Sequence, residues 1–238
     1  MMARRGALGL MAGGMVAALS GCGSLIPNSY RFKMRVEIET PLGLRTGTSV
    51  YEVRAGYTPK LLPEEAARDW TVAGEAVAVD LLEGRALFAL LKTVNPIRPD
   101  LALMSMAALD PAFENDIVES AARISSAEGI RSPAEVSPSD YPLLVSFRDL
   151  DDPKSVERVD PKNLAQNFGS GSIFRRITVE VTSEAVTTGL KDTLRWLDSG
   201  LPRLPISKYP PAGIELPLFA TLTKMDFELR RYELRELR

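Results

Sequence analysis

Strict alternation of apolar and polar residues is the clearest pattern in the chain, and it predicts a β-strand over residues 30–39. The apolar set consists of Phe32, Met34, Val36 and Ile38, and the polar set of Arg31, Lys33, Arg35, Glu37 and Glu39. Successive side chains on a strand point to opposite faces, so we expect one face of this strand to be buried and the other to meet solvent.

Two hairpins are predicted from the turn residues that follow. Pro41-Leu42-Gly43 leads into a β-branched, aromatic-containing stretch over residues 46–54, which is the expected partner of the first strand. Glu83-Gly84 suits a tight turn between strands over residues 75–82 and 85–91. The fold is therefore expected to begin with four antiparallel strands.

A helical period replaces the alternation after Asp110 and Pro111, which suit an N-cap and a first-turn proline. Three- and four-residue spacings place Phe113, Ile117, Ala121 and Ile124 on one face, and Gly129 is the expected end of this helix. We predict an α+β fold, a mainly antiparallel sheet built from hairpins with one amphipathic helix packed on it and short accessory helices.

The second half of the chain predicts shorter elements. Residues 143–148 and 173–182 have strand character, and residues 154–168 and 190–197 suit turns or short helices. The end, residues 226–238, fits either a strand or a frayed helix. One α+β domain is expected over residues 30–238.

The N-terminus has the parts of a secretory signal: Arg4 and Arg5, then an apolar run over residues 6–19, then small residues. Leu19-Ser20-Gly21-Cys22 resembles the lipobox of bacterial lipoproteins. The resemblance implies cleavage before Cys22, diacylation of its thiol and acylation, for example with palmitate, of the new amino group. Residues 1–21 would then be the signal peptide and residues 22–29 the lipidated tether. An apolar run of about 14 residues is too short to span a bilayer, which needs roughly 20.

The resemblance also implies a localisation in the cell envelope. Gly23 follows the cysteine where inner-membrane retention signals usually place aspartate, which favours the outer membrane facing the periplasm and leaves the inner membrane as the alternative. Arg4 and Arg5 leave the twin-arginine export route open beside the general one. Without the leader the formal net charge of −2 becomes −4, because the leader carries two arginines and no acid. Nucleic acid is therefore not an expected partner.

The chain has no histidine, and Cys22 is its one cysteine. These counts exclude Ser-His-Asp and Cys-His nucleophiles and histidine-containing zinc sites. Carboxylate pairs, Ser-Lys dyads and oxygen-ligated metals remain open, but no Ser-x-x-Lys occurs. No catalytic residue, metal ligand or cofactor is therefore assigned.

Four patterns that suggest a site have simpler explanations. Asp149, Asp151 and Asp160 have the spacing of calcium-loop ligands, but Pro153 and Lys154 spoil the loop, so we expect aspartates that start turns. The stretch Phe168-Gly169-Ser170-Gly171-Ser172 lacks the context of a phosphate-binding loop and is expected to be a flexible turn. Glu37 and Glu39 are expected on a solvated face. Trp70 and Trp196 are expected to anchor the core rather than to stack on sugars.

The mature region, including residues 152–160 and 186–190, is similar to a set of uncharacterised bacterial envelope proteins with no known activity. Together with the lipobox, this favours a lipid-anchored, non-catalytic protein that binds an envelope protein or cell-wall component, or serves in an assembly. An exposed apolar patch or an unpaired sheet edge is its expected docking surface. A carboxylate-dependent glycan hydrolase is the alternative.

Overall fold

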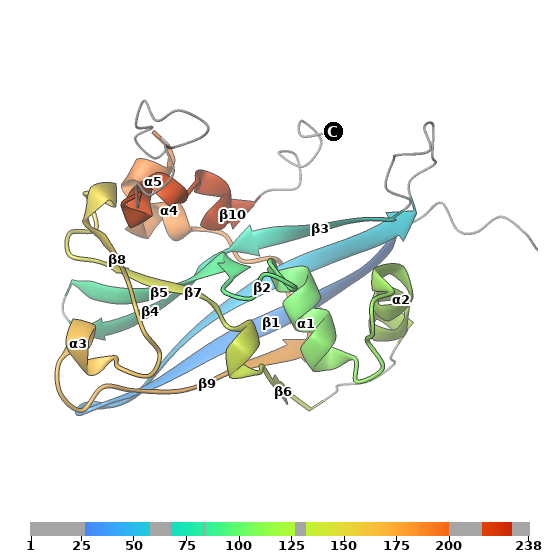
Figure 1. Ribbon diagram of the computed structural model, residues 1–238, viewed down its shortest axis with the longest axis horizontal. Helices are drawn as coiled ribbons and strands as arrows, with labels where there is room; N and C mark the ends of the chain where they lie inside the picture. Colours follow the sequence, from blue (N-terminus) through green and yellow to red (C-terminus); the bar gives the residue numbers. More distant parts are fainter. Residues whose placement is uncertain (1–26, 58–67, 83, 127–131, 200–215, 230–238) are drawn as a thin grey trace, which may run out of the picture.

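The structure, a computed structural model, describes residues 27–57, 68–82, 84–126, 132–199 and 216–229. Its strands form two antiparallel sheets, one of six strands in the order β10-β3-β2-β1-β9-β6 and one of four in the order β4-β5-β7-β8. The predicted α+β class is confirmed (Figure 1). No helix in these ranges is long and apolar enough to cross a membrane.

The six-stranded sheet consists of β1 (Asn28–Thr40), β2 (Gly43–Tyr57), β3 (Arg68–Glu75), β6 (Ala134–Glu135), β9 (Ile173–Val181) and β10 (Glu228–Leu229). The four-stranded sheet consists of β4 (Val77–Leu82), β5 (Arg85–Thr93), β7 (Pro142–Phe147) and β8 (Val156–Arg158). The α-helices are α1 (Leu101–Leu109), α2 (Ile117–Ser126), α3 (Ala165–Phe168), α4 (Leu190–Thr193) and α5 (Leu218–Thr221). Single 3-10 turns are η1 (Pro138–Asp140), η2 (Pro153–Ser155), η3 (Arg195–Leu197) and η4 (Lys224–Asp226).

The alternation along β1 predicts its two faces correctly. Its apolar side chains from Phe32 to Ile38 are fully buried, and the polar ones between them lie on the opposite face. The first hairpin is confirmed, with Thr40 opposite Gly43 and Asn28 opposite Ala55. Because β1 begins at Asn28, the last two residues assigned to the tether belong to the strand.

The chain passes from one sheet to the other at Ala76, between β3 and β4. The β4–β5 hairpin confirms the second predicted pair, whereas β3 was not predicted. The sheets approach closely at Gly47 of β2, where an added Cβ would lie 2.2 Å from the carbonyl oxygen of Ala78. Only glycine leaves room for this contact.

The helices differ from the prediction in number and start. Helix α1 was not predicted, and seven of its nine residues are buried. The predicted amphipathic helix is α2, but the predicted start at Asp110 was wrong. Helix α2 begins at Ile117, and its N-terminus is capped by Asp116, whose side chain accepts the backbone N–H of Glu119 at 3.0 Å. Asp110 instead follows the end of α1, and Gly129 lies outside the described residues.

The buried residues of the sheets and helices form one hydrophobic cluster on the inner face of the six-stranded sheet. Near the start of β1 this face is covered by α1 and α2, where the Tyr30 and Ser105 hydroxyls hydrogen-bond at 2.8 Å. Farther along the strand it is covered by β4 (Figure 1). Burial raises the pKa of the Tyr30 phenol well above its ordinary value, so Tyr30 stays neutral.

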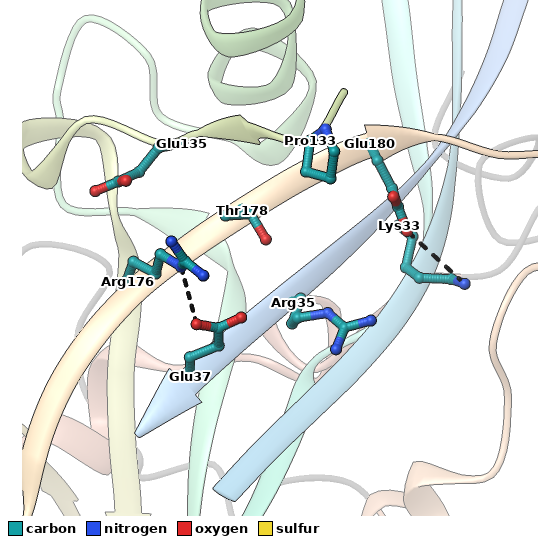
Figure 2. A pocket seen from close by; sticks show the side chains of 8 residues that line it. All are labelled: Lys33, Arg35, Glu37, Pro133, Glu135, Arg176, Thr178 and Glu180. Carbon is teal, nitrogen blue, oxygen red and sulfur yellow. Dashed lines mark hydrogen bonds and ion pairs between the residues drawn. The ribbon is translucent and has the colours of Figure 1, made fainter. Parts of the chain in front are cut away.

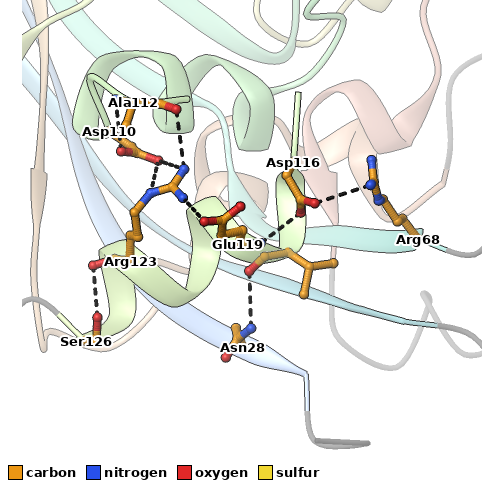
Figure 3. Close-up of polar contacts among 9 residues, drawn as sticks. Asn28, Arg68, Asp110, Ala112, Asp116, Glu119, Arg123 and Ser126 are labelled. Atoms are coloured by element: carbon orange, nitrogen blue, oxygen red, sulfur yellow. Dashed lines mark hydrogen bonds and ion pairs between the residues drawn. The ribbon is translucent and has the colours of Figure 1, made fainter. Parts of the chain in front are cut away.

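An ion pair between buried Asp110 and half-buried Arg123 joins the end of α1 to α2 (Figure 3). Asp110 accepts hydrogen bonds from Nε and Nη2 of Arg123 at 3.0 and 2.7 Å, and Glu119 pairs with the same guanidinium at 2.8 Å. Burial opposes ionisation of Asp110, but hydrogen bonds led by that of Arg123 outweigh it and lower its pKa. Asn28 also binds the Val118 carbonyl oxygen at 3.2 Å, which ties the start of β1 to α2.

The later predictions are largely confirmed. Strands β7 and β9 match the two predicted strands. Residues 154–168 hold the expected turn and short helix, η2 and α3, but also the strand β8, which was not predicted because it is only three residues long and is defined by its pairing with β7. The short helix predicted over residues 190–197 is present as α4 and η3. Residues 226–229 hold the end of η4 and β10, and the remainder of that ambiguous segment lies outside the described ranges.

Candidate functional site

A polar groove of about 260 Å³ runs over the outer face of β1 and β9 (Figure 2). Its walls are Lys33, Arg35, Glu37, Pro133, Glu135, Arg176, Thr178 and Glu180. Strand β1 provides the first three, β9 provides the three from Arg176 to Glu180, and the segment around β6 provides the other two. Three basic and three acidic side chains give the groove no net charge. Such a groove suits a neutral or zwitterionic polar ligand better than a polyanion or a polycation.

Antiparallel pairing arranges these side chains in rows across the strands. In one row, Glu37 faces Arg176, and their side chains form an ion pair at 2.8 Å. In another, Lys33 faces Glu180 at 4.0 Å and also pairs with Glu184. Directly opposed side chains on one face of a sheet are close enough to interact, so the register accounts for these pairs.

The middle row is different. Arg35 of β1 and Glu135 of β6 both face Thr178 of β9, which lies between them. Within the described ranges, none of these three side chains forms an ion pair or a hydrogen bond. Two strand spacings of about 4.8 Å place the backbones of Arg35 and Glu135 roughly 10 Å apart. The row therefore presents one positive charge, one hydroxyl and one negative charge to the groove.

A second cavity, of about 370 Å³, brings two glutamates together. Glu52 of β2 and Glu75 of β3 line it, and both are buried, at 5% and 3% exposure. Glu52 accepts from Nε of Arg54 at 2.9 Å, and one Glu75 oxygen accepts the Leu190 N–H at 2.6 Å. Sequence reasoning missed this pair because nothing in the linear pattern shows that β2 and β3 are neighbours.

The predicted site residues Leu19, Ser20, Gly21 and Cys22 lie outside the described residues. The predicted turns are confirmed at Asp149 and Asp160, each of which accepts the backbone N–H two residues later at 2.9 Å. At Asp151 the prediction was wrong: its backbone N–H donates to Asp149, and the next turn is started by Asp152, which accepts from the Lys154 N–H at 2.9 Å. In the part of the chain that the structure describes, no group of three acidic or sulfur side chains is placed to share a metal ion.

The other assignments are confirmed in the same way. Glu39 forms an ion pair with Arg175, as expected of a solvated face. Trp196 is buried against Phe147 and Phe227, and partly buried Trp70 donates to Asp100 at 2.9 Å. Residues 169–172 form the turn before β9, where Gly169 and Gly171 adopt φ of 88° and 87°.

Exposed large apolar side chains gather at the tip of the first hairpin. Leu44 and Ile173 both pair with Glu39 across the strands, and Leu42 lies in the adjoining turn. Glu39, which is paired with Arg175, lies between Leu44 and Ile173, so the exposed apolar side chains are separated by charge and are not joined into one apolar surface. These residues lie around the C-terminal end of β1.

Comparison of the chain with family models, with curated proteins and with solved structures gave no match.

Proposed function

We propose that this protein is a bacterial envelope lipoprotein, anchored in the membrane through acylated Cys22, whose body binds another envelope component without catalysing a reaction. The lipobox resemblance of residues 19–22 supports the anchor, and Gly23 favours the outer membrane, facing the periplasm. A body with a net charge of −4 has no electrostatic attraction to anionic lipid, so the acyl chains must hold it at the bilayer.

One observation carries the proposal: the strand closest to the anchor also builds the groove. Asn28, the first residue of β1, follows Cys22 by six residues, a span of at most about 20 Å. The same strand supplies Lys33, Arg35 and Glu37 to the groove. Pairing with β2 on one side and β9 on the other holds β1 in the middle of its sheet, so the groove would be kept within a limited distance of the bilayer.

Metabolic labelling with a fatty-acid probe tests the anchor. The natural chain should carry label and sediment with membranes, and Cys22→Ser should lose the label and leave the membrane fraction, because acylation needs the thiol. Ser24→Ala, a change in the same tether, should keep both properties. Label that persists on Cys22→Ser would refute the proposal.

The alternative, a carboxylate-dependent glycan hydrolase, is favoured by the cavity that Glu52 and Glu75 share. Glycosidases place two carboxyl groups about 5–9.5 Å apart across the scissile bond. A screen of glycan substrates with the full chain decides between the two functions. Turnover that Glu75→Gln abolishes and Glu180→Gln retains would establish the hydrolase, and no turnover is the result that the binding function predicts.

A further inference from the structure

The middle row of the groove interrupts a regular ladder of ion pairs. On either side of it, a base of one strand faces an acid of the next, as Glu37 faces Arg176 and Lys33 faces Glu180. At the position where a glutamate would complete the ladder opposite Arg35, the chain has Thr178. The consequence is an arginine and a glutamate that both lack an ionic partner within the described part of the chain.

We infer that Arg35, Thr178 and Glu135 form a binding subsite for a zwitterionic ligand, in particular a short peptide with free amino and carboxyl ends. Arg35 would bind the carboxylate, Glu135 the ammonium, and the Thr178 hydroxyl the peptide between them. The inference rests on the proposed function, because it names the ligand class of the same groove.

The spacing of the row selects the length of the ligand. The backbones of Arg35 and Glu135, from which the two charged side chains project at the groove, lie about two strand spacings, or roughly 10 Å, apart. An extended chain covers about 3.3 Å per residue, so the ends of a tripeptide match this separation. A single amino acid carries the same charges too close together to reach both Arg35 and Glu135.

The neighbouring rows explain why a ligand with only one charge fits less well. An anion bound at Arg35 lies beside the carboxylates of Glu37 and Glu180, and a cation at Glu135 lies beside the guanidinium of Arg176. A ligand with both charges satisfies both ends of the row and leaves the groove neutral. The groove volume of about 260 Å³ is just below the range of about 300–1,000 Å³ found for drug-sized ligands, which suits a ligand as small as a tripeptide.

Isothermal titration calorimetry of the full chain with trialanine tests the inference. Because the charges are exposed, we expect a dissociation constant on the order of 1 mM at low salt. Alanine, N-acetyl-trialanine and trialanine amide should each bind at least about threefold more weakly, since each loses one end contact. Raising the salt concentration should weaken trialanine binding as well.

Variants of the row locate the binding. Arg35→Gln and Glu135→Gln should each weaken trialanine binding by about threefold or more, and Thr178→Glu, which supplies the missing partner of Arg35, should abolish it. Arg148→Gln, which removes an exposed arginine from outside the groove, is the control and should bind like the natural chain.

Three results would overturn the inference: no binding of trialanine at 10 mM (about ten times the expected dissociation constant), binding of N-acetyl-trialanine or trialanine amide as tight as that of trialanine, or equal binding of trialanine by Thr178→Glu. None of them bears on the anchor, because the labelling of Cys22 reads out separately. Conversely, unlabelled Cys22 with intact trialanine binding would refute the anchor and keep the subsite.

Discussion

The Asp110–Arg123 pair allows a stability prediction with a worked magnitude. Asp110 is 5% exposed and receives two charge-assisted hydrogen bonds from Arg123, whose own side chain is 33% exposed. Hydrogen bonds to charged groups contribute about 1.5–3 kcal/mol. Because Arg123 can still reach water and Glu119, Asp110→Asn should destabilise the protein by about 2 kcal/mol.

Glu119→Gln is the matched control, since it removes the other carboxylate on the same guanidinium. Glu119 is 66% exposed, and an exposed pair four residues apart on a helix contributes about 0.3–0.5 kcal/mol. Urea denaturation of both variants at neutral pH, with unchanged dependence on denaturant, measures the difference. Equal losses of stability in the two variants would refute the argument that burial gives the Asp110 pair its strength.

The pH dependence gives a second readout of the same pair. The folded-state pKa of Asp110 is lowered, so ionised Asp110 stabilises the fold fully above the unfolded value of about 3.9. This contribution is lost as the pH falls through the lower folded-state pKa. The stability gap between the natural chain and Asp110→Asn should therefore narrow in acid. If the difference in unfolding free energy between the two proteins stayed constant down to the lowest pH at which both fold, the lowered pKa of Asp110 would be contradicted.

Three further predictions concern the two faces of β1, the close contact between the sheets, and metal binding. Val36→Asp should cost several kcal/mol because it buries an unpaired carboxylate, whereas Glu37→Ala should cost less than about 1 kcal/mol; similar denaturation midpoints would show that the faces of β1 are misassigned. Gly47→Val should destabilise strongly, because its Cβ has no room beside Ala78, and a melting temperature equal to that of the natural chain would refute the close approach. Thermal melts should not change with EDTA, and a drop of many degrees would point to a metal site.

The sequence predicts the first hairpin well because its strands keep one apolar and one polar face. It does not predict α1, whose residues Leu101–Leu109 are buried on nearly all sides and so have no amphipathic period. It also misplaces the start of α2, because Asp110-Pro111 resembles a helix start although Asp110 follows the end of α1. An Asp-Pro pair between two helices does not by itself show whether it follows the end of the first helix or begins the second.

The groove was only partly visible in the sequence. The polar face of β1, with Arg35 and Glu37, follows from alternation, but the partners Thr178 and Glu135 lie more than 90 residues away in the chain. Their places depend on the register of β9 against β1 and of β6 against β9, which no local pattern sets. The missing base–acid match at Thr178 becomes apparent only when the three strands are side by side.

The most direct test of the anchor is the intact mass of the protein extracted from membranes of the cells that make it. We predict a chain that begins at Cys22 and carries a diacylglyceryl group on the thiol and a further acyl chain on the amino group. A chain that still begins at Met1, or one cleaved elsewhere and free of lipid, would contradict the proposed function.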